Sequence, residues 1–237
     1  AAIAKTLAED GWTITLAGRD VSALATTHAS LPNGKHGWMR MDVTDAASVT
    51  QGVAQARAER GPVAALINNA GAVETAAFAK TDAALWQRML DINLSGAFTC
   101  TQAVLPDMLS AKHGRIVNIA STAALKGYAY VAAYCAAKHG LLGMTRALAQ
   151  ELAKSGVTVN AVCPGYTESD IVQNAIQNIT VKTGRSAEAA MQSLVQSNPT
   201  GRLVQPMEVA DAVRWLCGEH STSVNGQAIA VCGGETS

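Results

Sequence analysis

Three side chains of the sequence have the types and the spacing to move a proton together: Ser121, Tyr134 and Lys138. Tyr134 and Lys138 are four positions apart in an Ala-rich stretch without proline, which favours a helix. Both would project from one helical face, about 6 Å apart along the axis. Ser121 follows the apolar run 115–120, which is typical of a buried strand. Ligands bind where strands end in open α/β sheets, so we expect the three side chains to meet there.

The chemistry expected of this trio follows from charge. A free tyrosine titrates near a pKa of about 10. An ammonium about 5 Å away would favour the phenolate by about 3 kcal/mol at an effective dielectric constant of about 20, or about two pKa units. We therefore predict that Lys138 makes Tyr134 a usable general acid or base, and that the Ser121 hydroxyl holds a carbonyl oxygen against it. The alternative is a solvated Tyr–Lys pair without function.

The elements that must position these residues alternate between strands and helices. Strands are predicted at 13–17, 38–41, 63–67, 115–120, 157–162 and 227–231. Helices are predicted at 1–10, 21–29, from a cap at Thr44 or Asp45 to Arg60, at 82–111 with an irregularity near 93–96 and at Pro106, and at 134–154 and 206–217. This alternation indicates a doubly wound parallel sheet in one α/β domain, residues 1–237. The polar stretch 166–199 is predicted to be a substrate lid, the alternative being a surface helical pair without function.

Composition excludes several classes of partner. The chain has 237 residues, of which 49% are hydrophobic, and a formal net charge of zero. We expect no nucleic-acid partner and no membrane association, because the chain has no basic stripe and no apolar run of transmembrane length. The five cysteines and five histidines are scattered without metal-ligand spacing, which predicts no metal site and reduced thiols in a cytoplasmic protein.

The motif Tyr134-x-x-x-Lys138, with Ser121 thirteen residues before the tyrosine and Asn68-Asn69-Ala70-Gly71 upstream, resembles the short-chain dehydrogenase/reductase family. The resemblance extends over essentially the whole chain. It implies a Rossmann-like fold and hydride transfer between a nicotinamide and a carbonyl or secondary alcohol. In it Tyr134 exchanges the proton, Ser121 positions the oxygen and Lys138 tunes Tyr134. Asn93 would hold a water that completes the proton path, the alternative being a kink asparagine that bonds to local backbone.

The same resemblance implies a cofactor cleft along the strand ends. Arg19 stands where a carboxylate would bind the NAD ribose, which favours NADP(H) over NAD(H); a surface pair with Asp20 is the alternative. The other implied contacts are Asp42 and Val43 at the adenine, Asn69, Ala70 and Gly71 beside a ribose, Pro164 and Gly165 with Thr167 or Ser169 at the nicotinamide, and Tyr134 and Lys138. Asp42 as a cap and 69–71 as a simple turn remain open.

The segment 201–206 and the Gly233-Gly234 pair resemble ketoacyl and polyketide-type ketoreductases. This adds acyl thioesters to small carbonyls and alcohols as candidate substrates. Family members pair the helix that carries Tyr134 and the long helix before it across subunits, so we expect a homodimer or homotetramer. A non-catalytic dinucleotide-binding or regulatory protein on the same fold is the alternative. A serine hydrolase is disfavoured, because no G-x-S-x-G motif surrounds Ser121.

One part of the family pattern has no counterpart in this sequence. The family begins with a strand and a Thr-Gly-x-x-x-Gly-x-Gly turn that receives a pyrophosphate, whereas Ala1 matches a position just after that turn. We expect the chain to be an N-terminally shortened form of a longer protein. The missing strand would lie between the strands at 13–17 and 63–67, so we also expect two open strand edges.

Overall fold

The structure is a computed structural model that describes residues 1–236, with the side chains of Asp170, Ile171 and Lys182 left out of the description. The strands are β1 (Thr15–Gly18), β2 (Gly37–Arg40), β3 (Ala65–Asn68), β4 (Gly114–Ile119), β5 (Val157–Pro164) and β6 (Ala228–Val231). The α-helices are α1 (Ala2–Glu9), α2 (Val21–Ala29), α3 (Ala46–Arg60), α4 (Ala83–Leu90), α5 (Gly96–Ala111), α6 (Ala132–Glu151), α7 (Asp170–Thr183), α8 (Ala187–Val195) and α9 (Pro206–Cys217).

All strand pairs are parallel, and the strands form two sheets. β1 pairs with β2, while β3, β4, β5 and β6 form a four-stranded sheet in that order. Within residues 1–236, no strand pairs with the second edge of β1 or of β3. Two open edges were expected at these positions from the sequence.

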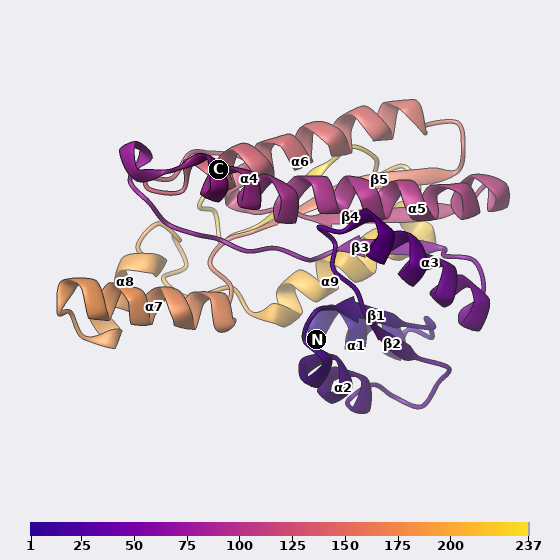
Figure 1. Ribbon diagram of the computed structural model, residues 1–237, viewed down its shortest axis with the longest axis horizontal. Coiled ribbons are helices and arrows are strands. Elements are labelled where there is room, and N and C mark those ends of the chain that lie inside the picture. The colour runs from indigo at the N-terminus through magenta and orange to yellow at the C-terminus, as the bar shows by residue number, and fades with distance from the viewer. Residues whose placement is uncertain (237) are drawn as a thin grey trace.

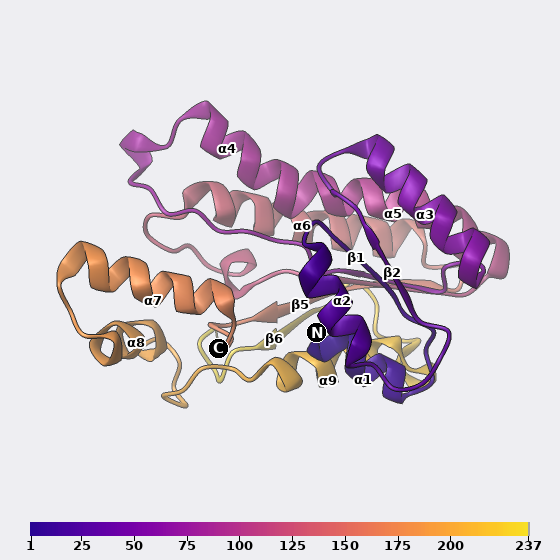
Figure 2. The same cartoon turned by 60° about the horizontal axis from the view of Figure 1, so that its bottom comes forward.

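Helices cover both faces of the four-stranded sheet. α5 and α6 lie on one face with α3 and α4 beyond them, and α9 with α1 lies on the other (Figures 1 and 2). In β4, Ile116 packs with Val104 and Met108 on the α5 side, whereas Val117 packs with Leu216 on the α9 side. A strand buried on both faces is a continuous apolar run, which is how the sequence presents it. The expected doubly wound α/β fold is confirmed.

Helix boundaries follow local chemistry where a cap is present. The Asp20 carboxylate accepts the Ala23 N–H at 3.0 Å and begins α2. Pro206 opens α9, where the Glu208 carboxylate accepts the Gln205 N–H at 2.7 Å. Both helices have the predicted bounds, because a capping side chain fixes the first turn independently of tertiary contacts.

Two elements differ from the sequence predictions in ways that bear on the site. The predicted irregularity in the long helix is a π-helical segment, Asp91–Ser95, between α4 and α5. β5 runs to Pro164 rather than ending at Val162. β4 ends opposite Val162 and only β6 continues beside Pro164. On the β4 side, Pro164 has no neighbouring strand that would require a backbone N–H from it. A sheet tolerates proline at such a position, because proline has no N–H to donate.

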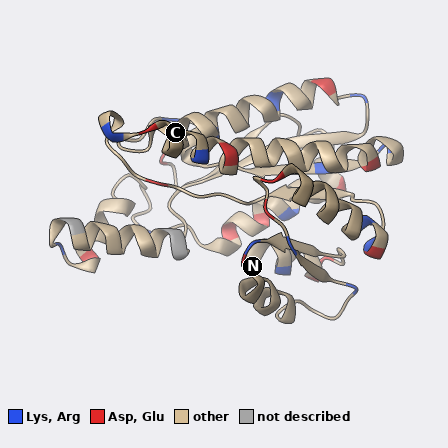
Figure 3. Cartoon of the chain, viewed as in Figure 1, with Lys and Arg blue, Asp and Glu red and all other residues tan. Residues whose placement is uncertain are grey.

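The expected lid region contains the helical pair α7 and α8, which projects from one end of the molecule (Figure 1). This pair has a small apolar cluster of its own, which includes Val172, Ile176 and Leu194. Acidic and basic residues are interspersed over the outer helices (Figure 3). None of the helices in the described part of the chain is both long and apolar enough to span a bilayer.

Candidate active site

The structure brings Ser121, Tyr134 and Lys138 together at the carboxyl end of the four-stranded sheet. Ser121 follows β4 by two residues, and its Oγ accepts the Ala123 N–H at 3.1 Å. Tyr134 lies in the first turn of α6, and its hydroxyl is hydrogen-bonded to the Ser121 hydroxyl. The Lys138 Nζ lies one turn further along α6, 5.7 Å from the centre of the Tyr134 ring. The arrangement expected from the spacing is therefore present.

The electrostatics of the pair differ from the expectation. Burial raises the pKa of Tyr134 above its ordinary value, and the hydrogen bond with Ser121 only partly opposes this. The predicted net lowering of the Tyr134 pKa is therefore wrong for this structure. The physical reason is that the low-dielectric surroundings disfavour charge on the phenol itself. The spacing of Tyr134 and Lys138 along a helix predicts that they lie close together, but it does not predict how far the fold removes them from water.

The amine of Lys138 is perturbed by the same surroundings. Its side chain is 3% exposed, and burial lowers its pKa to about 8. The Nζ donates a hydrogen bond to the Ile119 carbonyl at 2.9 Å. This contact aims the amine at the end of β4, between the strand that leads to Ser121 and the helix that carries Tyr134. An amine with this pKa loses its proton slightly above physiological pH. Lys138 is therefore charged in a smaller fraction of the molecules than we expected.

Asn93 lies in the π-helical segment and is 1% exposed. Its Nδ2 donates to the carbonyls of Ala72 (2.9 Å) and Met89 (3.0 Å), and its Oδ1 accepts the Ala72 N–H at 3.3 Å. The Met89 bond is the local backbone contact of the alternative interpretation, whereas the two Ala72 bonds join Asn93 to the segment after β3. Asn93 nevertheless faces the site, because a methyl group added at Gly71 would lie 3.1 Å from Asn93 Oδ1 and 3.6 Å from Lys138 Nζ. Gly71 thus keeps open the space where the two side chains converge.

Arg19 and Asp42 lie at the ends of β1 and β2. The Arg19 Nη1 is 4.0 Å from the Asp42 Oδ2, and the Arg19 side chain is 64% exposed. Asp20, the alternative partner, instead caps α2 through Ala23. Hydrogen bonds from Thr44 lower the pKa of Asp42 more than Arg19 does. An exposed pair at this distance is weak, so the Arg19 guanidinium is available to another anion.

The other expected contact residues lie along the same strand ends. Asn69, Ala70 and Gly71 form an exposed segment directly after β3. Val43 follows β2 and packs against Gly96, at the start of α5. Pro164 ends β5, Gly165 donates its N–H to Val231, and Thr167 Oγ1 donates to the Gly165 carbonyl at 3.0 Å. Ser169 donates to the Thr167 carbonyl and is exposed.

Comparison with known proteins gives the identity of the family. A family model described as short chain dehydrogenase matches residues 1–180. A candidate ketoacyl reductase of the monensin polyketide synthase from Streptomyces virginiae is 38% identical over 98% of this chain and 91% of its own. An acetoacetyl-CoA reductase from Paracoccus denitrificans is 38% identical over 95% of this chain and 88% of its own. The crystal structure of a single-residue variant of actinorhodin polyketide ketoreductase with NADPH aligns with a TM-score of 0.93 and 37% identity, covering 99% of this chain and 92% of that one.

The chain belongs to the short-chain dehydrogenase family.

The family match contains every residue that the sequence singled out for the site, from Arg19 to Thr167. It stops within α7, so the rest of the stretch 166–199 and the C-terminal strand lie beyond it. The fold of those later elements is nevertheless shared, because the structural alignment with the ketoreductase covers nearly the whole chain.

Sequence reasoning missed a second group of polar residues beside Ser121. The Tyr128 hydroxyl is 2.7 Å from Thr122 Oγ1 and 2.6 Å from Glu235 Oε1. Tyr128 also packs edge-on against Tyr166, with ring centres 6.5 Å apart. No motif or periodicity relates Tyr128 to Glu235, which is more than a hundred positions away, so only the fold reveals this group.

Proposed function

We propose that this short-chain dehydrogenase is an NADP(H)-dependent ketoreductase that interconverts a carbonyl group and a secondary alcohol. The observation that carries the proposal is the hydrogen bond between the Ser121 and Tyr134 hydroxyls at the end of β4, with the Lys138 amine behind the ring. Two hydroxyls that meet at one point match the oxygen of a carbonyl, which accepts two hydrogen bonds.

Each residue of the trio has a distinct proposed role. Tyr134 donates the proton to the carbonyl oxygen in the direction of reduction, and its raised pKa supports this because the phenol stays protonated at neutral pH. Ser121 donates a second hydrogen bond to the same oxygen and fixes its position. Lys138, held on the Ile119 carbonyl, stabilises negative charge on the phenolate left after proton donation. Asn93 braces the 71–72 backbone beside Lys138 and lies on the proposed path that returns the proton.

The residues present fit NADP(H) at two points of the cleft. When bound, the cofactor supplies or accepts the hydride. Gly71, after the end of β3, has no side chain beside Lys138 and Asn93, so a ribose could approach the backbone closely there. Arg19 offers an exposed guanidinium to a 2′-phosphate. Asp42, Val43, Asn69 and Ala70, with Pro164, Gly165 and Thr167 opposite, are the further proposed contacts.

We also propose a 3-oxoacyl thioester as the substrate class. Support comes from the names of the relatives, which include a candidate ketoacyl reductase and an acetoacetyl-CoA reductase. The region 166–199 is the proposed lid over this substrate, since α7 and α8 follow directly on the strand end that carries Pro164 and Gly165.

Two broader proposals concern assembly and location. A homodimer or homotetramer through α5 and α6 is supported by large apolar side chains left exposed on α5, Phe98 at 48% and Leu109 at 42%. A cytoplasmic location is supported by the cysteines, which are all free in the described residues. Light scattering on purified protein tests the assembly.

The function is tested by following NADPH consumption with acetoacetyl-CoA and with a panel of small ketones, with NADH in parallel. We expect turnover with NADPH that falls by about 10²- to 10⁴-fold in Tyr134→Phe, the range that a general acid supplies. Tyr130→Phe is the matched control, since Tyr130 is 67% exposed. Dinucleotide binding without turnover of any carbonyl or alcohol would instead identify a non-catalytic binding protein on the same fold.

A further inference from the structure

Glu235, which follows the turn after β6, carries a buried carboxylate outside the Ser121–Tyr134–Lys138 trio. Its side chain is 1% exposed. Three donors converge on its Oε1: the Tyr128 hydroxyl at 2.6 Å, the Ser197 hydroxyl at 2.8 Å and the Lys126 ammonium at 3.1 Å. Burial raises the pKa of Glu235, but these three contacts outweigh burial and lower it. The buried group therefore remains a carboxylate at neutral pH.

The three donors belong to two different segments that border the site. Lys126 and Tyr128 lie in the loop between Ser121 and Tyr134. Ser197 lies two residues beyond α8, at the end of the proposed lid. The Glu235 carboxylate thus contacts both the loop between Ser121 and Tyr134 and the end of the proposed lid. Glu235 itself belongs to a third segment, near the C-terminus.

The contact continues to the residue next to Ser121. The Tyr128 hydroxyl has one proton, which goes to the charged Glu235 oxygen because that bond is the stronger. The same hydroxyl oxygen therefore accepts the Thr122 hydroxyl, 2.7 Å away. Thr122 begins the short 3-10 turn that Ser121 caps. Glu235 is therefore linked to the Ser121 turn through two hydrogen bonds in series, while the Ser121 hydroxyl itself is bonded to the Ala123 N–H.

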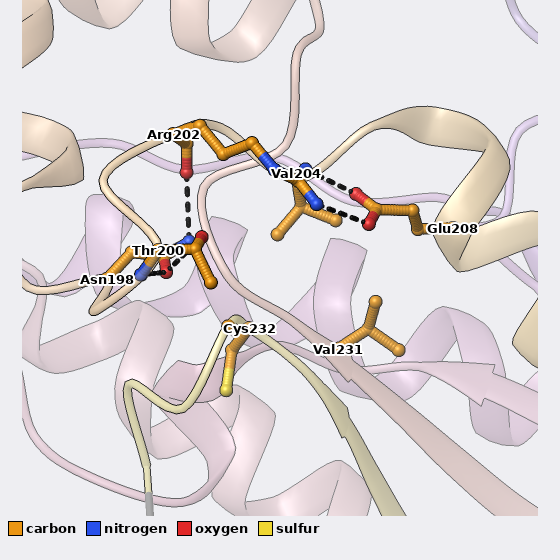
Figure 4. Close-up of a pocket in the computed structure, with 8 residues that line it drawn as sticks. Asn198, Thr200, Arg202, Val204, Glu208, Val231 and Cys232 are labelled. Atoms are coloured by element: carbon orange, nitrogen blue, oxygen red, sulfur yellow. Dashed lines mark hydrogen bonds and ion pairs between the residues drawn. The ribbon is translucent and has the colours of Figure 1, made fainter.

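The lid end is otherwise anchored on its α9 side in this region. The Asn198 amide donates to the Arg202 carbonyl at 2.9 Å and accepts from Thr200, and the Arg202 guanidinium binds Glu208 through two bonds of 2.7 and 2.8 Å (Figure 4). These bonds fix the segment after the lid to the start of α9. Ser197 lies at the junction between this segment and the lid helices, and its bond to Glu235 adds a contact on the side of the site.

We propose that Glu235 is a positioning residue that holds the lid closed over the substrate, and this rests on the function proposed above. The carboxylate touches neither the reacting atoms nor the trio directly. Loss of its charge would reduce the fraction of molecules with a closed lid, which weakens apparent substrate affinity in proportion. Turnover of the molecules that do close would change little.

The test compares Glu235→Gln and Ser197→Ala, which remove the two partners of the lid contact, with Glu219→Gln, an exposed carboxylate in the same C-terminal region, as the matched control. We expect both test variants to raise the KM for the carbonyl substrate by about tenfold, the effect of losing one charge-assisted hydrogen bond, and to change kcat by less than about threefold. Limited trypsin digestion at Arg185, in the loop between α7 and α8, should be about tenfold faster in both variants.

The digestion needs no substrate, so it decides the matter even if the protein reduces no carbonyl. Faster lid cleavage together with a higher KM supports the positioning role. Cleavage at the rate of the unmodified protein in both variants overturns it, whether or not their melting temperatures fall. A fall in kcat with unchanged KM also overturns it, because that result assigns Glu235 to the reaction rather than to the lid.

Discussion

Replacing Lys138 with methionine tests the charge that the structure places behind Tyr134. Methionine keeps the length of the side chain and removes the titrating amine. Burial lowers the pKa of Lys138 to about 8 from its ordinary value of 10.5, and each unit is worth about 1.4 kcal/mol. The buried ammonium therefore lowers the free energy of unfolding by about 3 kcal/mol at neutral pH. The hydrogen bond that the amine donates to the Ile119 carbonyl is a separate contribution and is not part of this figure.

The sign of the pH dependence follows from that lowered pKa. Between about pH 8 and pH 10.5 the unfolded chain binds this proton and the folded protein does not, so the contribution of Lys138 to stability rises with pH. Other groups titrate in the same range, among them Cys100 and Cys163, whose pKa values burial raises to about 11. Cys100 is shifted by burial alone and cancels in the difference between the two proteins, whereas the Lys138 charge lowers the pKa of Cys163, so this thiol contributes a smaller part of the difference.

The measurement is urea unfolding of both proteins at about pH 7 and about pH 9.5. We expect the stability of Lys138→Met relative to the unmodified protein to decrease by about 2 kcal/mol between these two conditions. Lys154→Met, at an exposed lysine beyond the end of α6, is the control and should show no such change. A difference that does not vary with pH would refute the inference that the Lys138 amine is desolvated.

Three further predictions concern the site. Ser121→Ala should lower kcat for carbonyl reduction by about 10²-fold, because one of two donors to the carbonyl oxygen is lost; an unchanged kcat would remove Ser121 from the mechanism. Gly71→Ala should weaken NADPH binding by about tenfold, measured by fluorescence titration, since the added methyl lies 3.1 Å from Asn93 Oδ1; equal affinity would show that the cofactor does not pass there. Arg19→Ala should raise the KM for NADPH by about tenfold and leave that for NADH unchanged, whereas equal effects on both would argue against 2′-phosphate recognition.

The sequence predicted the order and type of the elements well where a local signal fixes them. Asp20 and Pro206 mark the starts of α2 and α9 through capping and a fixed backbone angle, and those bounds agree with the structure. The irregularity around Asn93 was also predicted, though not that it is a π-helical turn. The end of β5 was placed too early, because the acceptance of Pro164 depends on how far the neighbouring strand β4 extends.

For the site, the spacing of Tyr134 and Lys138 predicted their proximity correctly, but the direction of the Tyr134 pKa shift was wrong. A pKa depends on how much water the fold removes, and helical periodicity carries no information about that. Glu235 was missed for a related reason. Its three partners come from distant segments, and each is an ordinary polar residue in its own sequence context.

The spread of the expected contact residues over several strand ends has a consequence for thermal stability. Arg19 and Asp42 follow β1 and β2, Ser121 follows β4, and Pro164 ends β5. These residues come together only in the folded chain, so a dinucleotide that contacts all of them binds the folded protein and not the unfolded one. Its presence in excess would therefore raise the melting temperature, and the rise would grow with its concentration.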